Sequence, residues 1–251
     1  MPDNVAMEEK VRVSKLLSEL GLCSRREADS YIEQGLVTVD GEVVNELGSR
    51  AFRGQKIELQ SGAKVQQASR ITVILNKPVG FISHFDDEKD YPPAASLITP
   101  ENYFPSPLDR GRNPRFNTRG LAPAGRLDID STGMLVLTQV GRIAKLLIGE
   151  SSPIEKEYLV RVEGALSFDD LDRLKHGLEL DGVALKPAQV SWQNEDQLRF
   201  VLREGRKRQI RKMCEMVGLK VLGLKRVRMG RISLGTLPPG KWRFVGPHEQ
   251  F

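Results

Sequence analysis

The sequence predicts an α+β protein made of a small helix-and-hairpin module and a larger domain with a mixed or antiparallel sheet. Apolar segments typical of strands recur from residue 71 onward, separated by irregular connections and only a few helical patterns, and no segment repeats. The chain of 251 residues is long enough for a small module joined to a domain of ordinary size. We therefore expect a module at residues 10–59, a linker at 60–70 and a second domain at 71–251.

Two short helices begin the first module. The apolar residues of the first helix fall at helical spacing, namely Val13, Leu16, Leu17 and Leu20. Gly21 follows them and is a residue type that readily ends a helix. Ser24 and Glu27 then form the S-x-x-E pattern of a capping box, and Gly35 supplies the next stop. The spacing therefore predicts a second helix between Ser24 and Gly35.

A β-hairpin and a linker follow the two helices. Apolar and polar residues alternate on both sides of Asp40-Gly41, which is among the strongest short signals for a hairpin turn. Residues 60–70 are polar and small and carry no periodic pattern, so we expect them to connect the two parts of the chain without regular structure.

The second domain begins with a strand and a long connection. The strand pattern of residues 71–83 is interrupted at 77–80, and seven of the 14 prolines of the chain lie within residues 84–124. A connection of that length inside a compact domain is usually functional or mobile, so a binding role and a mobile surface loop are both open for it. The later patterns are strands at 134–138, 156–164 and 198–202, helices at 139–149, 167–177 and 208–218, and final strands within 220–235 and 241–245.

Composition excludes several classes of protein. The chain is 39% apolar and 28% charged, as in globular proteins, and no window approaches the roughly 18 apolar residues that a membrane span needs. The first residues mix acids and bases and lack the apolar core of a secretory signal, so we expect a cytoplasmic protein. The cysteines and histidines are isolated and lack metal-ligand spacing, which predicts a reducing compartment and no zinc: Cys23, Cys214, His84, His176 and His248.

Positive charge is concentrated near the C-terminus. The formal net charge is only +5, but residues 199–231 contain twelve Lys or Arg against two acids. Such an excess indicates a surface for a polyanion. A merely solvated charged face is the alternative, and we favour the polyanion because the basic residues run through strand and helix patterns.

Two arginines occupy an unfavourable place in the first module. Arg25 and Arg26 lie in the first turn of the second predicted helix, where the helix dipole disfavours cations. A bound phosphate would remove this conflict, and Lys10, Arg12 and Lys15 would extend the same patch. The alternative is two arginines that are simply solvated at an exposed helix start.

The segment at residues 124–138 places charge directly before an apolar strand. Gly125 permits a sharp turn, and Arg126 is suited to neutralise or orient a carboxylate. Asp128 stands just before the strand, where a carboxylate can face a cleft as a nucleophile, a base or a metal ligand. Alternatively, Asp128 and Asp130 only cap free amides of a turn.

The same segment also matches the D-x-D-x-T pattern of Mg²⁺-dependent aspartyl phosphotransferases, through Asp128, Asp130 and Thr132. In that family the aspartates end an apolar strand and a later acidic motif completes the metal site. The residues before Asp128 do not form such a strand, and the later acidic cluster at 168–172 is better explained as a helix start. We therefore retain this reading only as a minor alternative.

The motifs together resemble the pseudouridine synthases that modify bacterial ribosomal RNA and carry an N-terminal S4-like RNA-binding module. The resemblance covers nearly the whole chain in the order of the family, and the large-subunit enzymes are more similar than the small-subunit ones. It is carried by residues 15–44 for the S4-like module and by "NKPVG" at 76–80, "GRLDIDSTGMLVLT" at 125–138, "EKEYLV" at 155–160 and "EGRKRQIRKMCEMVG" at 204–218. The resemblance implies an S4-like domain followed by a catalytic domain of this family.

The resemblance also implies the site residues. The catalytic aspartate of the family matches Asp128, the active-site tyrosine matches Tyr158, and the arginine that pairs with the aspartate matches Arg211. Residues expected to contact the substrate are Arg126, Leu224 as an apolar wall, Lys77, Lys207, Arg208 and Lys212. Residues expected to bind the RNA backbone are Arg12, Lys15, Arg25, Arg26, Lys225, Arg226 and Arg228.

These assignments suit the chemistry of uridine isomerisation. The C1′–N1 bond must break, the uracil must turn, C5 must join C1′, and the C5 proton must leave. An ionised Asp128 would act as the nucleophile or stabilise a ribosyl intermediate, and Arg211 would fix its direction. Tyr158 would offer a flat face for the base and a hydroxyl for deprotonation of C5. No electron or phosphoryl group is transferred, so the resemblance implies no cofactor and no metal.

The sequence therefore predicts an RNA pseudouridine synthase that acts on ribosomal RNA, with 23S rRNA favoured over 16S rRNA. A uridine in a duplex must be unstacked, which favours a loop or bulge as the target. Free RNA and a pre-ribosomal particle are both open as substrates. We expect a monomer, since no sequence feature demands an oligomer. The alternative from another class is a non-catalytic RNA-binding or ribosome-assembly protein with the same fold.

Overall fold

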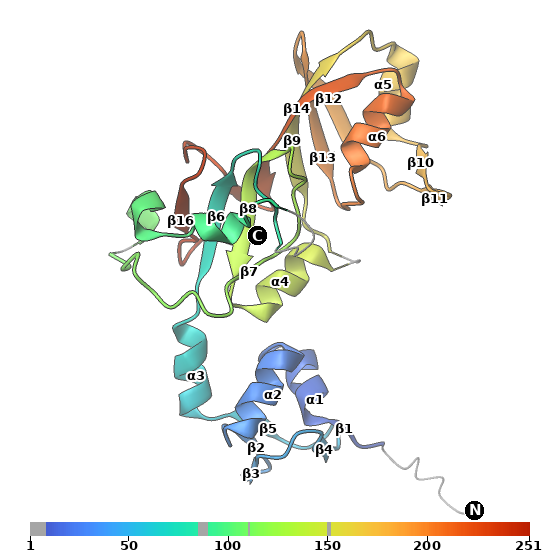
Figure 1. Cartoon of the computed structure of the whole chain (residues 1–251). Coiled ribbons are helices and arrows are strands. Elements are labelled where there is room, and N and C mark those ends of the chain that lie inside the picture. The colour runs from blue at the N-terminus through green and yellow to red at the C-terminus, as the bar shows by residue number, and fades with distance from the viewer. Residues whose placement is uncertain (1–8, 85–89, 110, 150–151) are drawn as a thin grey trace, which may run out of the picture. The chain divides into compact units, whose positions relative to one another are not determined.

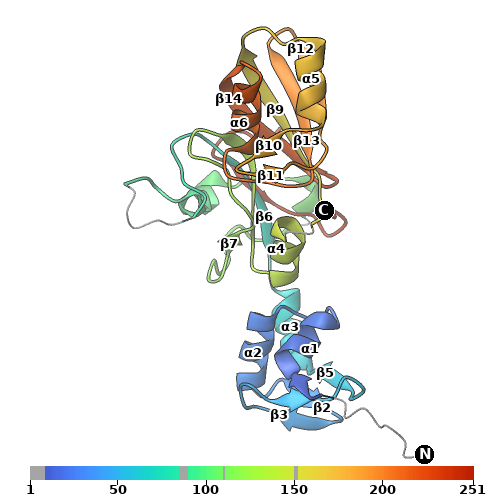
Figure 2. The ribbon, with the colours of Figure 1, turned by 90° about the vertical axis from the view of Figure 1, so that its right-hand side faces the viewer.

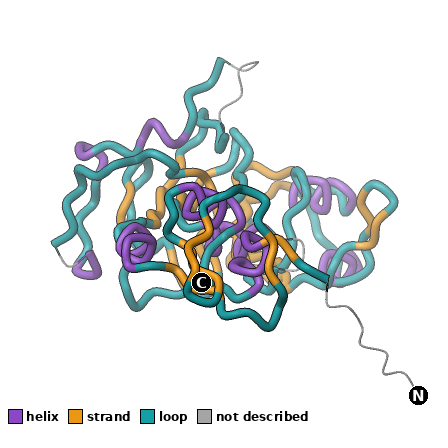
Figure 3. The backbone as a smooth tube through the Cα atoms, turned by 90° about the horizontal axis from the view of Figure 1, so that it is seen from below, coloured by secondary structure: helices purple, strands orange, loops and turns teal. Residues whose placement is uncertain are grey.

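The structure is a computed structural model that describes residues 9–84, 90–109, 111–149 and 152–251. The chain divides into two compact units, Met1–Arg70 with Val140–Ile143, and Ile71–Gln139 with Ala144–Phe251. Figure 1 labels the elements and Figure 2 gives the ribbon turned by 90°. The tube in Figure 3 shows that short helices and strands alternate with many loops.

The two helices predicted for the first unit are confirmed. α1 (Val13–Glu19) is followed by Gly21 in the left-handed region, with φ of 70°. α2 (Arg25–Glu33) begins with the predicted capping box, because Ser24 Oγ accepts from the Glu27 N–H and Glu27 Oε2 accepts from the Ser24 N–H at 2.6 Å. The buried faces of both helices contribute to an apolar core that belongs to this unit alone.

The predicted hairpin is also confirmed. β2 (Val37–Val39) pairs antiparallel with β3 (Glu42–Val44), and the turn residues Asp40 and Gly41 both have positive φ, as a tight hairpin turn requires. β2 also pairs with β5 (Ile57–Leu59), which makes a sheet of order β3-β2-β5. A separate small ladder joins β1 (Val11–Arg12) to β4 (Arg50–Ala51).

The expectation of an unpatterned linker at 60–70 is wrong in its local structure. Residues Ser61–Ala68 form the helix α3, and Ala63 is buried in the core of the first unit. Alanine, lysine and glutamine favour helices, and a single buried alanine supplies little hydrophobic periodicity. The helix was therefore hard to recognise from the apolar pattern.

The second unit is built on one large mixed sheet, which confirms the predicted α+β class. Its order in the described residues is β12-β13-β9-β14-β8-β6-β16, with β15 beside β14 and β7 beside β8. Only the β14–β8 pair is parallel among these neighbours. The strands are β6 (Thr72–Lys77), β7 (Ala122–Pro123), β8 (Thr132–Thr138), β9 (Lys156–Glu163), β12 (Gln189–Asn194), β13 (Gln197–Leu202), β14 (Lys220–Met229), β15 (Ile232–Ser233) and β16 (Trp242–Phe244).

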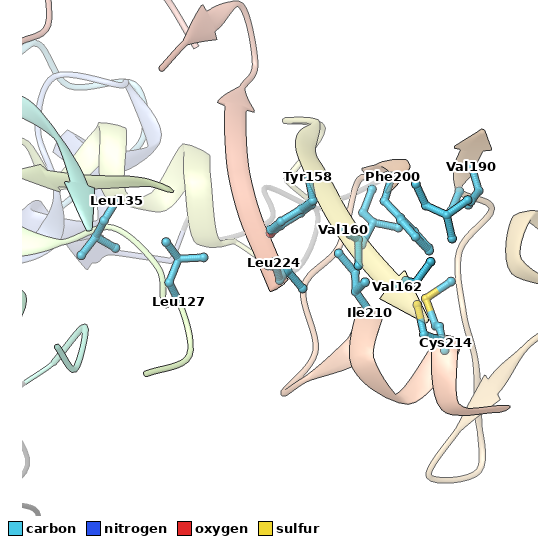
Figure 4. Packing of buried hydrophobic residues seen from close by; sticks show 14 of the residues in the cluster. Leu127, Leu135, Tyr158, Val160, Val162, Val190, Phe200, Ile210, Cys214 and Leu224 are labelled. Atoms are coloured by element: carbon cyan, nitrogen blue, oxygen red, sulfur yellow. The ribbon is translucent and has the colours of Figure 1, made fainter. Parts of the chain in front are cut away.

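Two helices cover one face of the β12-β13-β9-β14 end of this sheet. α5 (Phe168–Lys175) packs on β12, and α6 (Gln209–Met216) packs on β14. Figure 4 shows Val160 of β9 and Phe200 of β13 beside Ile210 and Cys214 of α6, and all four belong to the core of this unit. The remaining elements are α4 (Gly141–Ile148) and the small ladder of β10 (Glu179–Leu180) with β11 (Val183–Ala184).

Part of the long connection after β6 packs onto the core. It contains the 3₁₀ turns η1 (Ala94–Leu97), η2 (Pro100–Asn102) and η3 (Pro107–Asp109). Trp242 of β16 donates its indole N–H to the carbonyl of Thr99 at 2.7 Å, and the ring of Tyr103 lies 5.0 Å from that of Trp242. This part of the connection is therefore tied to the sheet. Among the described residues, no helix combines the length and apolar character that crossing a bilayer requires.

Candidate active site

The turn that carries Asp128 is fixed through its backbone. Gly125 enters it with φ of 104°, which confirms the sharp turn expected there. Ser83 Oγ donates to the carbonyl of Leu127 at 2.7 Å and accepts from the Leu127 N–H at 2.8 Å. The carbonyl of Ile129 accepts from the N–H of Gly80 at 3.0 Å, so the segment after β6 holds this turn from both sides of Asp128.

The buried side chain of Arg226 supports the same turn, which differs from the role in RNA binding that we expected for it. We expected Arg226 to hold the RNA backbone, but its side chain is only 2% exposed. Its Nε donates to the carbonyl of Met134 at 2.7 Å and its Nη1 to the carbonyl of Arg126 at 3.3 Å. β8 and β14 approach closely here because Gly133, with φ of 100°, lies against the backbone of Arg226, where a Cβ would clash.

Lys77 is likewise structural. We expected it to contact substrate, but it is fully buried, and its Nζ donates to the carbonyls of Pro78 at 2.8 Å and Phe81 at 2.9 Å. Burial lowers the pKa of Lys77 to about 8, against the opposing effects of Asp130 and Asp128. Lys77 therefore closes the turn after β6 and does not line the cleft.

A cleft of about 920 Å³ lies in front of this turn. It brings together the three residues expected to carry the chemistry, Asp128, Tyr158 and Arg211, with Leu224. Tyr158 of β9 and Leu224 of β14 are each 8% exposed, and Figure 4 shows their side chains close together on neighbouring strands. The guanidinium of Arg226 lies 6.0 Å from the centre of the Tyr158 ring. Leu224, expected as an apolar wall, therefore lines the cleft beside Tyr158 (Figure 4).

Arg211 pairs with Asp130 rather than with Asp128. Its Nη2 lies 3.2 Å from Asp130 Oδ2 and donates to the carbonyl of Asp130 at 3.1 Å. Arg208 binds the same carboxylate, with Nη2 3.2 Å from Oδ2. The Nε of Arg211 is buried and has no hydrogen-bond partner in the described part of the chain.

The carboxylate of Asp128 stands apart from this ion-pair cluster. Within the described ranges its side chain has no hydrogen bond and no ion pair, while its backbone carbonyl accepts from the N–H of Ser131 at 3.0 Å. Arg126, which we expected to orient a carboxylate, is exposed and has no side-chain hydrogen bond in those ranges. Asp128 therefore presents an unpartnered carboxylate to the cleft.

The cleft is strongly basic. Its described lining has nine Lys or Arg against two acids, Asp128 and Glu204. Lys156 is one of these basic residues, and sequence reasoning did not single it out, although it stands two positions before Tyr158 on the same face of β9. Burial, with the charges of Arg226 and Lys186, lowers the pKa of Lys156. A cleft of this charge suits a polyanionic substrate.

The basic run of the sequence separates into different groups in the structure. Arg228, expected to bind RNA, is held by two carboxylates, with Nε 2.7 Å from Glu157 and Nη2 3.2 Å from Glu155. Lys212 pairs with Asp181 at 2.9 Å on the surface. The exposed lysines of this run that have no side-chain partner in the described part of the chain are Lys207 and Lys225.

The basic residues of the first unit lie on its surface. Arg12, Arg25 and Arg26 are exposed, and Lys15 is partly exposed with its Nζ 3.8 Å from Glu19. Neither Arg25 nor Arg26 has a side-chain hydrogen bond or ion pair within the described residues, although both stand in the first turn of α2. The conflict between these two cations and the helix dipole is therefore present in the structure.

No cluster of three His, Cys, Asp or Glu suited to a metal ion occurs among the residues that the structure describes. Asp128 and Asp130 precede the strand β8 rather than ending one. This placement differs from the arrangement that the phosphotransferase alternative requires.

Comparison with known sequences decides the family. The profile of RNA pseudouridylate synthase matches residues 71–216, and the S4 domain profile matches residues 11–55. The chain belongs to the RNA pseudouridine synthase family. The phosphotransferase alternative is therefore wrong, and the predicted S4-like domain is confirmed.

Relatives of this synthase match it over nearly its whole length. An uncharacterized RNA pseudouridine synthase of Aquifex aeolicus is 32% identical over 240 residues, which cover 95% of this chain and 94% of the relative. The ribosomal large subunit pseudouridine synthase B of Bacillus subtilis is 32% identical, with 95% and 93% covered. The dual-specificity RNA pseudouridine synthase RluF of Escherichia coli is 33% identical, with 96% and 78% covered.

The fold also matches a solved structure. The crystal structure of a pseudouridylate synthase aligns with a TM-score of 0.60 at 25% identity, and the match covers 94% of this chain and 96% of that one. The synthase fold of the second unit and the S4-like first unit thus occur together in related proteins.

Proposed function

We propose that this synthase isomerises a uridine of ribosomal RNA, with 23S rRNA as the substrate. The observation that carries the proposal is the unpartnered carboxylate of Asp128 in a basic cleft that also holds Tyr158 and Arg211. The choice of RNA is supported by the Bacillus subtilis relative, which is named for the ribosomal large subunit.

Asp128 is the proposed catalytic residue. A carboxylate without a protein partner is free to approach C1′ of the ribose, either as a nucleophile or as the stabiliser of a ribosyl intermediate. The C1′–N1 bond breaks, the uracil turns, C5 bonds to C1′, N1 gains a proton and the C5 proton leaves to solvent. Arg211 is proposed to approach Asp128 or the substrate through its unpartnered Nε while Asp130 holds its other end.

Tyr158 and Leu224 are proposed to hold the base. Both line the cleft from adjacent strands, so the uracil can lie against the tyrosine ring with leucine as an apolar wall. The tyrosine hydroxyl is then the proposed base for removal of the C5 proton. Arg126 and Lys207 line the same cleft and are proposed to contact the substrate, with Arg208 beside them and Lys212 on the same helix as Arg211.

RNA binding is proposed to divide between two domains. Residues 10–59 act as the S4-like RNA-binding domain, with Arg12, Lys15, Arg25 and Arg26 on RNA phosphates, and residues 71–251 act as the catalytic domain with Lys225 as a further phosphate contact. The target uridine leaves a loop or bulge, since unstacking costs least there. We place the enzyme in the cytoplasm as a monomer that acts on free rRNA or on a pre-ribosomal particle.

Tritium release from RNA that carries [5-³H]uridine tests this proposal. Separate 23S and 16S transcripts are incubated with the enzyme in EDTA, and precursor ribosomal particles are assayed in parallel. Release from 23S RNA, as a transcript or in its particle, is the expected result. Release only from 16S RNA contradicts the proposed substrate, and tight binding without release from any RNA supports the non-catalytic alternative.

A further inference from the structure

A second cavity lies beside the cleft in the same unit. Its volume is about 630 Å³, and its floor is apolar, formed by Ala188, Val190 and Val201, which are all buried. Lys186 and Arg203 line both this cavity and the cleft of Asp128. The two cavities therefore share a wall, and a ligand in one is adjacent to a ligand in the other.

The second cavity is lined by more cations than acids, and one of the cations has no partner in the described residues. The cations are Lys175, Lys186 and Arg203, and the acid is Glu155. Lys175 pairs with Asp172 at 2.8 Å, and Arg203 pairs with Glu155 at 3.1 Å. Lys186 lies on the shared wall, and its Nζ has no hydrogen bond or ion pair in the described ranges. Its ammonium group is thus available to a ligand.

Lys186 also belongs to a group of cations that line the same cleft and outnumber the acids there. Lys186, Lys156 and Arg226 all line the cleft, and the charges of the other two, after burial itself, lower the pKa of Lys156. Of the acids that line the two cavities, Glu155 is held by Arg203 and Arg228, and Glu204 accepts from the side chain of Gln209 and from the backbone N–H of Lys186, so Asp128 is the acid without a partner among the described residues. Cations gathered around a cavity repel one another, and an anion placed between them would relieve that repulsion.

We propose that the second cavity is a subsite for the nucleotide adjacent to the target uridine, with Lys186 holding the phosphate that joins the two nucleotides. The proposal rests on the proposed function, because it requires an RNA chain in the cleft. The volume suits a group of nucleotide size, the apolar floor suits a base, and the shared basic wall suits the connecting phosphate.

The nucleoside uridine and oligouridylates of one to four nucleotides test the proposal by calorimetric titration of the full chain. Four proteins are compared: the wild type, Lys186→Ala, Gln189→Trp and Lys220→Ala. Gln189 is an exposed residue that lines the second cavity, so tryptophan there fills the cavity without entering the core. Lys220 is an exposed lysine of the same unit that lines neither cavity, so its change to alanine is the charge-matched control.

The gain in affinity with oligonucleotide length is expected to differ among the four proteins. In the wild type and Lys220→Ala, the second nucleotide raises affinity about tenfold, as one charged hydrogen bond would. Lys186→Ala and Gln189→Trp lose this gain but keep the affinity for the nucleoside uridine, which carries no phosphate. Lys186→Ala also lowers the slope of log K against log salt by about 0.7, the value for one phosphate of a single strand.

The subsite proposal is wrong if the second nucleotide raises the affinity equally in all four proteins, or if it does not raise the affinity of the wild type. The rRNA tritium assay separates this failure from failure of the proposed function. Tritium release without the gain rejects the subsite alone, whereas the gain without release from any rRNA supports the subsite and rejects the proposed function. Thermal melts of the variants establish that each protein is folded.

Discussion

Arg211 and Asp130 form an ion pair of 3.2 Å between Nη2 and Oδ2, although Asp128, two residues earlier, is the aspartate that lacks a partner in the described part of the chain. The same guanidinium nitrogen also binds the backbone carbonyl of Asp130, so one residue holds Arg211 through both its side chain and its main chain. Arg208 shares the carboxylate at 3.2 Å. Asp130 thus balances two arginines at the edge of the cleft and leaves Asp128 free.

Asp130→Asn is expected to lower kcat about tenfold, because Arg211 loses the charge that fixes its orientation. RNA affinity should change less, since the arginines keep their charge. Steady-state kinetics measure the two effects separately. Asp181→Asn is the matched control. Asp181 lies outside the cleft and pairs at 2.9 Å with Lys212, which stands on α6 as Arg211 does. Equal kcat values for the two variants would refute the positioning role of Asp130.

Tyr158→Phe is expected to lower kcat by about 10²-fold while the melting temperature stays unchanged. Tyr158 is 8% exposed and packs in the core of the second unit, so phenylalanine preserves its contacts and removes only the hydroxyl. Tyr158→Ala should in addition destabilise the fold by about 3 kcal/mol. Kinetics and thermal melts check both variants. Full activity of Tyr158→Phe would show that the ring, and not the hydroxyl, carries the role.

The double change Arg25→Ala and Arg26→Ala is expected to raise KM with little change in kcat. These exposed side chains have no partner in the described residues, so their proposed role is to hold RNA phosphates. The slope of log K against log salt should fall by about 1 for each phosphate that the variant no longer binds. Arg53→Ala is the control, because Arg53 of the same unit already binds Glu19 at 2.6 Å. The same salt slope in the wild type and the double variant would contradict this role.

Glu157→Gln is expected to destabilise the protein by about 2 kcal/mol at neutral pH. Hydrogen bonds from Arg199 and then from Arg228 hold the pKa of Glu157 below its ordinary value of 4.5, against the opposing effect of burial. A pKa that is lower in the folded state gives stability that is present above 4.5 and is lost as pH falls through the folded value. Denaturant unfolding at several pH values should therefore show the difference from wild type shrinking below pH 4.5.

Glu163→Gln provides the comparison, since Glu163 forms an exposed pair with Lys220 at 3.3 Å. This change should cost less than about 1 kcal/mol at any pH. If Glu157→Gln lost as much stability relative to the wild type in acid as at neutral pH, the arginine pairing would not be the cause of that loss.

Local patterns were sufficient to predict much of the fold. The capping box of Ser24 and Glu27, the Asp40-Gly41 hairpin and the strand after Asp128 depend on residues close in sequence, and all three occur as expected. The helix Ser61–Ala68 was missed because it buries little apolar surface. The family motifs located the residues of the cleft, since most of these motifs lie on elements that line it.

The contacts of the basic residues could not be predicted, because they depend on the tertiary structure. Arg226 and Arg228 stand in the same basic run, yet one is buried on backbone carbonyls and the other is neutralised by glutamates at and just before the start of β9. The pairing of Arg211 with Asp130 also arises from the approach of α6 to the turn before β8. Sequence spacing contains no information on which of two nearby aspartates an arginine reaches.

Asp128 is proposed to perform the isomerisation in this cleft. The most direct test of this proposal is single-turnover formation of pseudouridine in 23S rRNA by Asp128→Asn, with RNA binding measured on the same samples. The control is Asp196→Asn, which changes an exposed aspartate outside the cleft lining. We predict that Asp128→Asn binds RNA as the wild type does and forms no pseudouridine, while Asp196→Asn is fully active. Pseudouridine formation by Asp128→Asn at the wild-type rate would contradict the account.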